Sequence, residues 1–223
     1  MTHHNHNSQN NKKVPWVPIL IITLAVLALG YFLFKSQPAN PGSQANSQAN
    51  TDLHGHSGTG STDSSVLNSL VGKPLPDIKL ADKDGKNYTA GDFKGKATIL
   101  FFNEGLMCYP ACWNQMASFG TDQRFNTDKI QAVSVVVDPA KDWQKAIDKM
   151  PDLAKSATLF DAGGATSRSL GLLNLPSSMH KGSLPGHTYI VLDKDGIVRY
   201  VNDDPNMALA NEALISKISE FQN

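Results

Sequence analysis

The chain has 223 residues, 40% of them hydrophobic, and its 20 Lys and Arg residues balance 20 Asp and Glu residues. This neutral balance, without any long run of Lys or Arg, argues against the strongly basic surface typical of nucleic-acid-binding proteins. The two cysteines are too few for the multiple-disulfide framework of a small secreted domain.

The first part of the chain contains a candidate membrane span. Residues 1–13 are polar, whereas residues 14–34 contain no charged side chain. At 1.5 Å per residue, a helix of about 20 residues is long enough to cross a bilayer. Trp16 and Tyr31 lie near the two ends of this stretch, where aromatic side chains suit the membrane interfaces. We therefore predict a transmembrane anchor over 14–34, preceded by a short tail.

The lysines around this span indicate its orientation. Lys12 and Lys13 precede it and Lys35 alone follows it, which favours a cytoplasmic N-terminus. We therefore expect a single-pass protein of the cell membrane whose C-terminal domain is extracytoplasmic. A cleaved signal peptide is the alternative. The residues directly after the span form a poor cleavage site, although Ala39 keeps this alternative open.

A polar linker separates the span from the remainder of the chain. Residues 35–64 consist mostly of Ser, Gln, Asn, Gly and Pro, with almost no large apolar side chain. Such a segment cannot bury enough surface to fold by itself, so we predict a disordered linker. Residues 65–223 have the size of one ordinary domain.

Residues 65–223 alternate between strand-like and helix-like patterns. Apolar runs bounded by turn residues predict strands over residues 76–82, 86–90, 97–102, 130–138, 157–161, 187–193 and 196–202. The aspartate–glycine turns between the first two and between the last two of these strands predict two hairpins. Helical patterns cover residues 110–123, 139–150, 164–173 and 206–222. The last helix has six apolar residues available for one buried face: Met207, Leu209, Leu214, Ile215, Ile218 and Phe221. This order of strands and helices predicts an α/β layered sheet.

The two cysteines lie where a predicted strand gives way to a predicted helix. Cys108 comes a few residues after the strand, Pro110 fits the first helical position, and Cys112 lies just inside the helix. The helix N-terminus should stabilise a thiolate on Cys108. Residues four apart in a regular helix have Cβ atoms about 5–6 Å apart, whereas a disulfide needs about 3.5–4.5 Å. Cys108 must therefore leave helical geometry to bond to Cys112.

Structural interpretations of the pair are weaker. A disulfide between Cys108 and Cys112 closes a very small loop, so it would remove little entropy from the unfolded chain. Simple apolar packing of two cysteines is the other structural alternative. Their position favours chemistry, because ligands of open α/β sheets gather at the carboxyl ends of strands. Held open, the same pair could offer two thiolates to a soft metal ion.

Two long segments carry a resemblance to a known family. They read VGKPLPDIKLADKDGKNYTAGDFKGKATILFFNEGLMCYPAC and GHTYIVLDKDGIVRYV. The chain is similar over residues 65–223 to the thioredoxin-fold redoxins, specifically the alkyl hydroperoxide reductase and thiol-specific antioxidant branch and its membrane-anchored thioredoxin-like relatives. The resemblance implies a thioredoxin-like fold, with a central mixed sheet flanked by helices, and redox chemistry at Cys108 and Cys112.

The departures from the family pattern bear on the activity. Ordinary thioredoxin-like reductants carry C-x-x-C, whereas this chain has C-x-x-x-C. Similar peroxiredoxins carry P-x-x-x-T-x-x-C, and this chain has Phe101 and Gly105 in place of the Pro and Thr. Loss of the Thr hydroxyl argues against efficient peroxide reduction. Glu104 could replace that polar group, but we interpret it as a solvated loop acid.

A histidine near the end of the domain adds a metal-binding alternative. In thioredoxin-like folds, a cis-proline that packs against the cysteine pair occupies the position of His187. With this histidine, the chain resembles the Sco family of copper-delivering assembly factors, and by resemblance Cys108, Cys112 and His187 are the copper ligands. The prolines that usually follow each Sco cysteine are absent, since Tyr109 and Trp113 stand there.

Two other interpretations of the late histidines stay open. His187 could act as a general acid or hydrogen-bond to a thiolate, or be a buried histidine bonded to the backbone. His180 lies in a loop rich in Ser, Gly and Pro, so we interpret it first as a loop residue.

These patterns together predict a membrane-tethered, extracytoplasmic thiol–disulfide oxidoreductase that requires no cofactor and acts on protein thiols or disulfides. Cys108 would be the more exposed thiolate and would attack, and Cys112 would resolve the mixed disulfide. The first alternative is a Sco-like copper-binding factor that uses Cys108, Cys112 and His187. The second is a thiol peroxidase in which Cys108 becomes a sulfenic acid and Cys112 condenses with it.

Overall fold

The computed structural model describes residues 64–222. The predicted tail over 1–13, the predicted anchor over 14–34 and the predicted linker up to residue 63 lie outside this part of the chain. Among the described residues, no helix combines the length and the apolar character that a membrane crossing needs.

Seven strands form one mixed sheet. They are β1 (Leu80–Ala81), β2 (Asn87–Tyr88), β3 (Ala97–Asn103), β4 (Ile130–Val136), β5 (Ala157–Phe160), β6 (Thr188–Leu192) and β7 (Val198–Asp203). The strand order is β2-β1-β5-β4-β3-β6-β7. Strands β3, β4 and β5 are parallel, and every other pairing is antiparallel. The predicted α/β architecture is therefore confirmed for the described residues.

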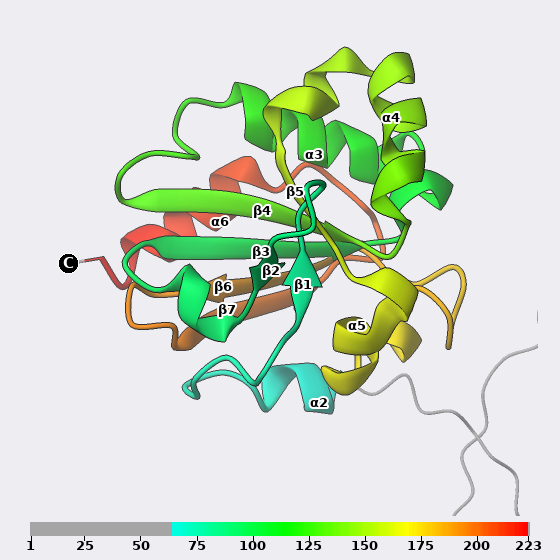
Figure 1. Cartoon of the computed structure of the whole chain (residues 1–223). Coiled ribbons are helices and arrows are strands. Elements are labelled where there is room, and N and C mark those ends of the chain that lie inside the picture. Colours follow the sequence, from blue (N-terminus) through cyan, green and yellow to red (C-terminus); the bar gives the residue numbers. More distant parts are fainter. Residues whose placement is uncertain (1–63, 223) are drawn as a thin grey trace, which may run out of the picture. The chain divides into compact units, whose positions relative to one another are not determined.

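Within residues 64–222, five α-helices and five short 3-10 helices surround the sheet. The α-helices are α2 (Ser65–Asn68), α3 (Ala111–Thr121), α4 (Ala140–Lys149), α5 (Ala165–Ser169) and α6 (Asn211–Ser219). The 3-10 helices are η1 (Ala90–Phe93), η2 (Gly105–Met107), η3 (Pro151–Lys155), η4 (Ala162–Gly164) and η5 (Leu172–Asn174). Helices α3, α4 and α6 pack on one face of the sheet, and α2 and α5 lie on the other (Figure 1).

The central strand β3 is buried on both faces of the sheet. All seven of its side chains are buried, as expected for a continuous apolar run. Ile99 and Phe101 point into the core beneath α3, α4 and α6, and Leu100 and Phe102 point into the core on the opposite face. The carboxyl end of this central strand therefore leads directly into the cysteine segment.

Both predicted hairpins are present, and each is held by an aspartate at the end of its first strand. Asp82 and Asp193 each accept hydrogen bonds from the backbone amides two and four residues later. Gly85 and Gly196 follow with φ angles of 83° and 81°, in the left-handed region that favours glycine. The turn sequence DKDG, which occurs in both hairpins, therefore adopts the same local structure in each.

The last helix is shorter than predicted, since it begins at Asn211 rather than near residue 206. The Asp204 carboxylate accepts hydrogen bonds from the amides of residues 206 and 208, which stabilises a turn instead of a helix. Met207 in this turn has a φ of 51°, and Leu209 is 62% exposed. The prediction that these two residues belong to the buried helix face was wrong.

Candidate active site

Cys108 and Cys112 form a disulfide at the carboxyl end of β3. Their Cα atoms are 5.4 Å apart, and the Cys112 amide donates a hydrogen bond to the Cys108 carbonyl oxygen over 3.0 Å. Cys108 has φ −98° and ψ 39°, outside the helical region, as the spacing argument predicts. The side chain of Cys108 can therefore reach Cys112 in the first turn of α3.

The helix begins one residue later than predicted. Pro110 is the N-cap of α3 and not its first helical residue, and the Tyr109–Pro110 peptide bond is cis. Neither an acidic side chain nor a side-chain cap occupies the first turn of α3. The positive end of the helix dipole therefore remains available to stabilise a thiolate beside it.

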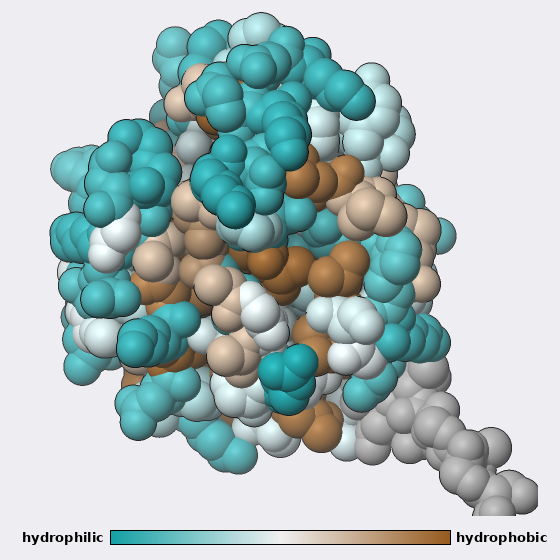
Figure 2. All heavy atoms as spheres, turned by 45° about the vertical axis from the view of Figure 1, so that its right-hand side comes forward, coloured by the Kyte–Doolittle hydropathy of each residue, from teal (hydrophilic) through white to brown (hydrophobic). Residues whose placement is uncertain are grey.

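Both sulfurs are shielded from solvent in the disulfide form. Cys108 is 2% exposed and Cys112 is 0% exposed, so the expected greater exposure of Cys108 is small. The residues on either side of Cys108 are different: Met107 is 59% exposed and Tyr109 is 60% exposed. Figure 2 turns forward the side of the molecule at which β3 ends, and apolar residues gather across the middle of this face. Cys108 is therefore a buried residue between two exposed neighbours.

Gly105, just before the cysteines, combines a left-handed backbone, which favours glycine, with a close approach to the Asp138 side chain. Its φ is 59°, and a Cβ atom at this position would overlap the Asp138 carboxylate. The Leu106 amide donates a hydrogen bond of 2.9 Å to the same carboxylate, which lies in the loop after β4. Burial raises the pKa of Asp138, and the Leu106 hydrogen bond opposes this shift. A threonine therefore cannot occupy this position without rearrangement.

Glu104 is buried, so its interpretation as a solvated loop acid was wrong. Its carboxylate accepts hydrogen bonds from the amides of Met179 and His180, at 2.7 and 3.1 Å, and lies 2.8 Å from His180 Nδ1. Burial of a carboxylate is tolerable when it satisfies backbone amides in this way. Glu104 therefore holds the loop that precedes β6. His180 belongs to this contact and not to the group around the sulfurs.

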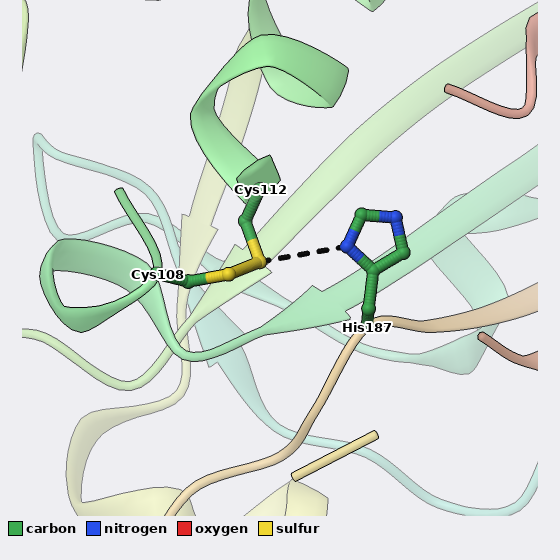
Figure 3. Close-up of side chains that lie close together, drawn as sticks. All are labelled: Cys108, Cys112 and His187. Carbon is green, nitrogen blue, oxygen red and sulfur yellow. Dashed lines mark hydrogen bonds between the residues drawn. A yellow bond between two sulfur atoms is a disulfide. The ribbon is translucent and has the colours of Figure 1, made fainter. Parts of the chain in front are cut away.

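His187 is the histidine that the structure brings to the cysteines. It precedes β6 directly, is 0% exposed, and places Nδ1 3.5 Å from the Cys112 sulfur (Figure 3). The potential ligand atoms of Cys108, Cys112 and His187 all lie within 4.8 Å of one another. Burial lowers the pKa of His187 to about 4, although the charge of Asp204 acts in the opposite direction. The imidazole is therefore neutral at neutral pH.

Two buried side chains behind His187 were not found from the sequence. The Tyr189 hydroxyl lies 2.6 Å from His187 Nε2 and donates a hydrogen bond of 3.2 Å to Gln115 Oε1. Burial raises the pKa of Tyr189, so its hydroxyl stays protonated. The sequence spacing could have indicated that both residues lie near the site. Tyr189 is two residues from His187 on the same strand face, and Gln115 is three residues from Cys112 on the same helix face.

A methionine adds a third sulfur to the site. Met207 Sδ lies 4.0 Å from Cys108 Sγ, whereas His187 contacts the other sulfur of the disulfide, that of Cys112. Met207 comes from the turn before α6, so β3, α3, β6 and the α6 turn all contribute to the surroundings of the disulfide. The site therefore combines soft sulfur donors with one neutral imidazole.

Sequence comparison places residues 70–213 in the family described as Redoxin. Peroxiredoxin Q of Triticum aestivum is 31% identical over 131 residues, which are 58% of this chain and 57% of that protein. The thiol-disulfide oxidoreductase ResA of Bacillus thuringiensis subsp. konkukian is 28% identical over 129 residues, or 57% of this chain and 66% of that protein. This chain therefore spans less than two thirds of the length of these relatives.

Solved structures share the fold at lower sequence identity. Peroxidoxin BcpB from Mycobacterium tuberculosis superimposes with a TM-score of 0.55 and 21% identity, over 69% of this chain and 99% of that one. Enterococcus faecalis AhpC superimposes with a TM-score of 0.56 and 18% identity, over 69% and 92% of the two chains. These likenesses confirm the predicted thioredoxin-like fold of the described residues.

Proposed function

Because the chain belongs to the Redoxin family, we propose that it is a thiol–disulfide oxidoreductase whose cysteine pair exchanges electrons with the thiols or disulfides of partner proteins. The observation that carries this proposal is the disulfide between Cys108 and Cys112 at the junction of β3 and α3. This position is where reactive groups gather in an open α/β sheet. The pair can cycle between dithiol and disulfide without a bound cofactor.

The surroundings of the two sulfur atoms indicate which cysteine attacks first and which attacks second. Cys108 lies ahead of the α3 N-terminus and between two exposed neighbours, so we assign it the attack on a partner disulfide. Cys112 lies inside the helix against His187, so we assign it the attack on the resulting mixed disulfide. The second attack releases the reduced partner and restores the bond between the two cysteines.

Gly105 supports disulfide exchange over peroxide reduction. The related peroxidase pattern has Thr at this position, and its hydroxyl helps to shape the peroxide pocket. Here the left-handed backbone and the Asp138 carboxylate leave room for glycine only. The peroxiredoxin Q relatives keep peroxidase activity as the alternative, whereas the relative ResA is a thiol-disulfide oxidoreductase, the activity that we propose for this chain.

The test compares two oxidants on the same protein. The reduced full chain, purified in detergent, is mixed with an aromatic disulfide or with hydrogen peroxide at equal concentration, and the remaining thiols are counted over time. We expect the disulfide to oxidise the pair faster, and Cys108→Ser to abolish that reaction. Faster oxidation by hydrogen peroxide would instead support the peroxidase alternative.

We also propose that the protein is tethered to the cell membrane with its redoxin domain outside the cytoplasm. The support is the uncharged stretch of residues 14–34 and the distribution of lysines around it. The reaction partners would then be protein thiols or disulfides on the extracytoplasmic side. Neutral overall charge gives no support for a nucleic-acid partner.

A second candidate function is copper binding, as in the Sco-like alternative. Its support is the convergence of Cys108, Cys112 and His187, whose ligand atoms lie within 4.8 Å of one another. After reduction of the disulfide, two thiolates and an imidazole suit Cu(I), and Tyr189 at the second ring nitrogen would hold the histidine in place. Copper would be the cargo of such a protein, and the same three residues would hold it.

A titration separates this candidate from disulfide exchange. Cu(I) is added to the reduced full chain while the ultraviolet copper–thiolate absorbance is followed. Copper binding predicts saturation near one ion per chain, weaker binding by His187→Ala, and unchanged binding by the control His180→Ala. Absence of the copper–thiolate band in the wild-type chain would exclude this function.

A further inference from the structure

A buried chain of polar contacts runs from Cys112 into the core. Cys112, His187, Tyr189 and Gln115 are each 0% exposed. His187 contacts Cys112 through Nδ1 over 3.5 Å and Tyr189 through Nε2 over 2.6 Å. The Tyr189 hydroxyl in turn lies 3.2 Å from Gln115 Oε1. The donors and acceptors in the contacts of Tyr189 with His187 and Gln115 decide which nitrogen of His187 carries the proton.

The contacts beyond Gln115, at the far end of this series, fix the orientation of its side-chain amide. The hydrogen bond from Arg124 holds the pKa of Asp122 well below its usual range, so Asp122 is a carboxylate that can only accept. Asn211 therefore donates to it through Nδ2, at 3.0 Å, and turns Oδ1 toward Gln115 Nε2, at 2.8 Å. The Ala210 amide, which can only donate, lies 2.7 Å from Gln115 Oε1. Both contacts identify Oε1 as the acceptor that faces Tyr189.

The orientation of Gln115 determines the remaining hydrogen bonds. Because Oε1 can only accept, the Tyr189 hydroxyl must donate to it; the opposite arrangement would set two acceptor oxygens against each other at 3.2 Å. The Tyr189 oxygen then accepts from His187 Nε2–H. A neutral imidazole with its proton on Nε2 presents the Nδ1 lone pair to the Cys112 sulfur.

We propose that Tyr189 and Gln115 are positioning residues that hold His187 with its proton on Nε2 and its Nδ1 lone pair toward Cys112, where it can accept the proton of the reduced thiol. This inference rests on the proposed exchange of disulfides and adds the base for its second step. Packing supports the same geometry. Phe101 stacks on Tyr189 with ring centroids 4.8 Å apart and meets His187 edge-on at 4.6 Å, which restricts both rings.

In the second step, one sulfur–sulfur bond forms and another breaks. Cys108 is bonded to a partner sulfur, and the Cys112 thiol transfers its proton to His187 Nδ1. The Cys112 thiolate attacks the Cys108 sulfur, so the bond between the two cysteines forms as the bond to the partner breaks. The partner sulfur leaves as a thiolate and takes up the proton from the imidazolium, directly or through water. The partner disulfide has gained two electrons, which the cysteine pair has lost.

Nitrogen NMR tests the positioning directly. The oxidised full chain is labelled with ¹⁵N in its histidine rings, and the His187 resonances are identified as those missing in His187→Gln. We expect a protonated Nε2 and an unprotonated Nδ1 in the wild-type chain, and loss of this preference in Tyr189→Phe and Gln115→Leu. A proton on Nδ1 in the wild-type chain would overturn the proposal.

A single-turnover reaction tests the consequence for the second step. The reduced chain is mixed with an aromatic disulfide whose thiolate absorbs light; Cys108 releases the first thiolate and Cys112 the second. We expect Tyr189→Phe and Gln115→Leu to slow the second release by about 10-fold to 100-fold and to leave the first unchanged. The variant Gln115→Glu, which keeps an acceptor oxygen, should resolve faster than Gln115→Leu.

The controls separate this inference from the proposed function. Tyr88→Phe, in β2 at the opposite edge of the sheet, should behave as wild type in both measurements. If Gln115→Leu fails to fold, the second-release rate of Tyr189→Phe and the NMR spectrum of the wild-type chain still test the positioning role. Second release at the wild-type rate in Tyr189→Phe would overturn the positioning role alone. Absence of a second release from the wild-type chain would overturn the proposed function itself.

Discussion

Two single residues decide what the cysteine pair can do. Gly105 has a φ of 59° and lies against the Asp138 carboxylate, so the position has no room for the threonine of the peroxidase pattern. His187 lies against Cys112 in a fully buried environment that keeps its imidazole neutral. With Gly105 the site lacks the threonine hydroxyl of the peroxidase pattern, and with His187 it has an imidazole that can accept a proton.

The first prediction at this scale concerns the space around Gly105. Gly105→Ala should lower the free energy of unfolding by about 3 kcal/mol, from about 1 kcal/mol of left-handed strain and about 2 kcal/mol of overpacking against Asp138. Gly163→Ala is the matched control, because Gly163 has a φ of 73° and open space around its Cβ position. Urea unfolding of both variants measures the difference. Equal losses would show that the Asp138 contact does not restrict the site.

The second prediction concerns the pH dependence of stability. The pKa of His187 falls from 6.5 to about 4 on folding, so between these values the unfolded chain binds the proton and the folded chain does not. Stability is therefore complete above about pH 6.5 and declines as the pH falls toward 4, by up to about 3 kcal/mol. The charges of Asp203 and Asp204 limit this decline.

The measurement is urea unfolding of the oxidised chain between pH 4 and 7. His187→Gln should lose the part of the pH dependence that this residue contributes, whereas the control His180→Gln should retain it. Identical pH profiles for wild type and His187→Gln would contradict a neutral, buried His187.

At the scale of elements, the site depends on how the loop between η5 and β6 is held. Glu104, at the end of β3, accepts two backbone hydrogen bonds from this loop and contacts the His180 ring. The loop leads directly into His187 and β6. The carboxylate of one segment therefore positions the backbone of another segment that is about 75 residues away in sequence.

The third prediction follows from this contact. Glu104→Ala leaves two amides of the loop without their acceptor, so it should lower the free energy of unfolding by roughly 2–4 kcal/mol and speed amide hydrogen exchange over residues 177–186. His180→Ala removes only the contact of a 41% exposed ring and should cost less than about 1 kcal/mol. Unchanged exchange in Glu104→Ala would show that the loop does not depend on this carboxylate.

At the scale of the whole molecule, the sequence pattern predicted the architecture but not the contacts between distant segments. Continuous apolar runs identified the central strands, and aspartate–glycine turns identified the two hairpins, because these features depend on neighbours in sequence. The buried position of Glu104 and the contacts of Gln115 and Tyr189 depend on segments brought together by the sheet. The late start of α6 depends on hydrogen bonds that compete with the helix.

The fourth prediction concerns the part of the chain that precedes the redoxin domain. If residues 14–34 anchor the protein, the full chain should sediment with membranes and resist extraction at high salt, and deletion of residues 1–35 should release it. Protease added outside intact cells whose outer layers have been removed should degrade the domain. Full protection from that protease, with cytoplasmic proteins as the reference, would contradict the proposed orientation.

The central claim is that Cys108 attacks a partner disulfide and Cys112 resolves the product. The most direct measurement is the amount of thiolate that the reduced full chain releases from an aromatic disulfide in a single turnover. We expect two equivalents from the wild-type chain, one from Cys112→Ser with a stable adduct on Cys108, and none at a comparable rate from Cys108→Ser. An equally fast reaction of Cys108→Ser, with its adduct on Cys112, would contradict the account.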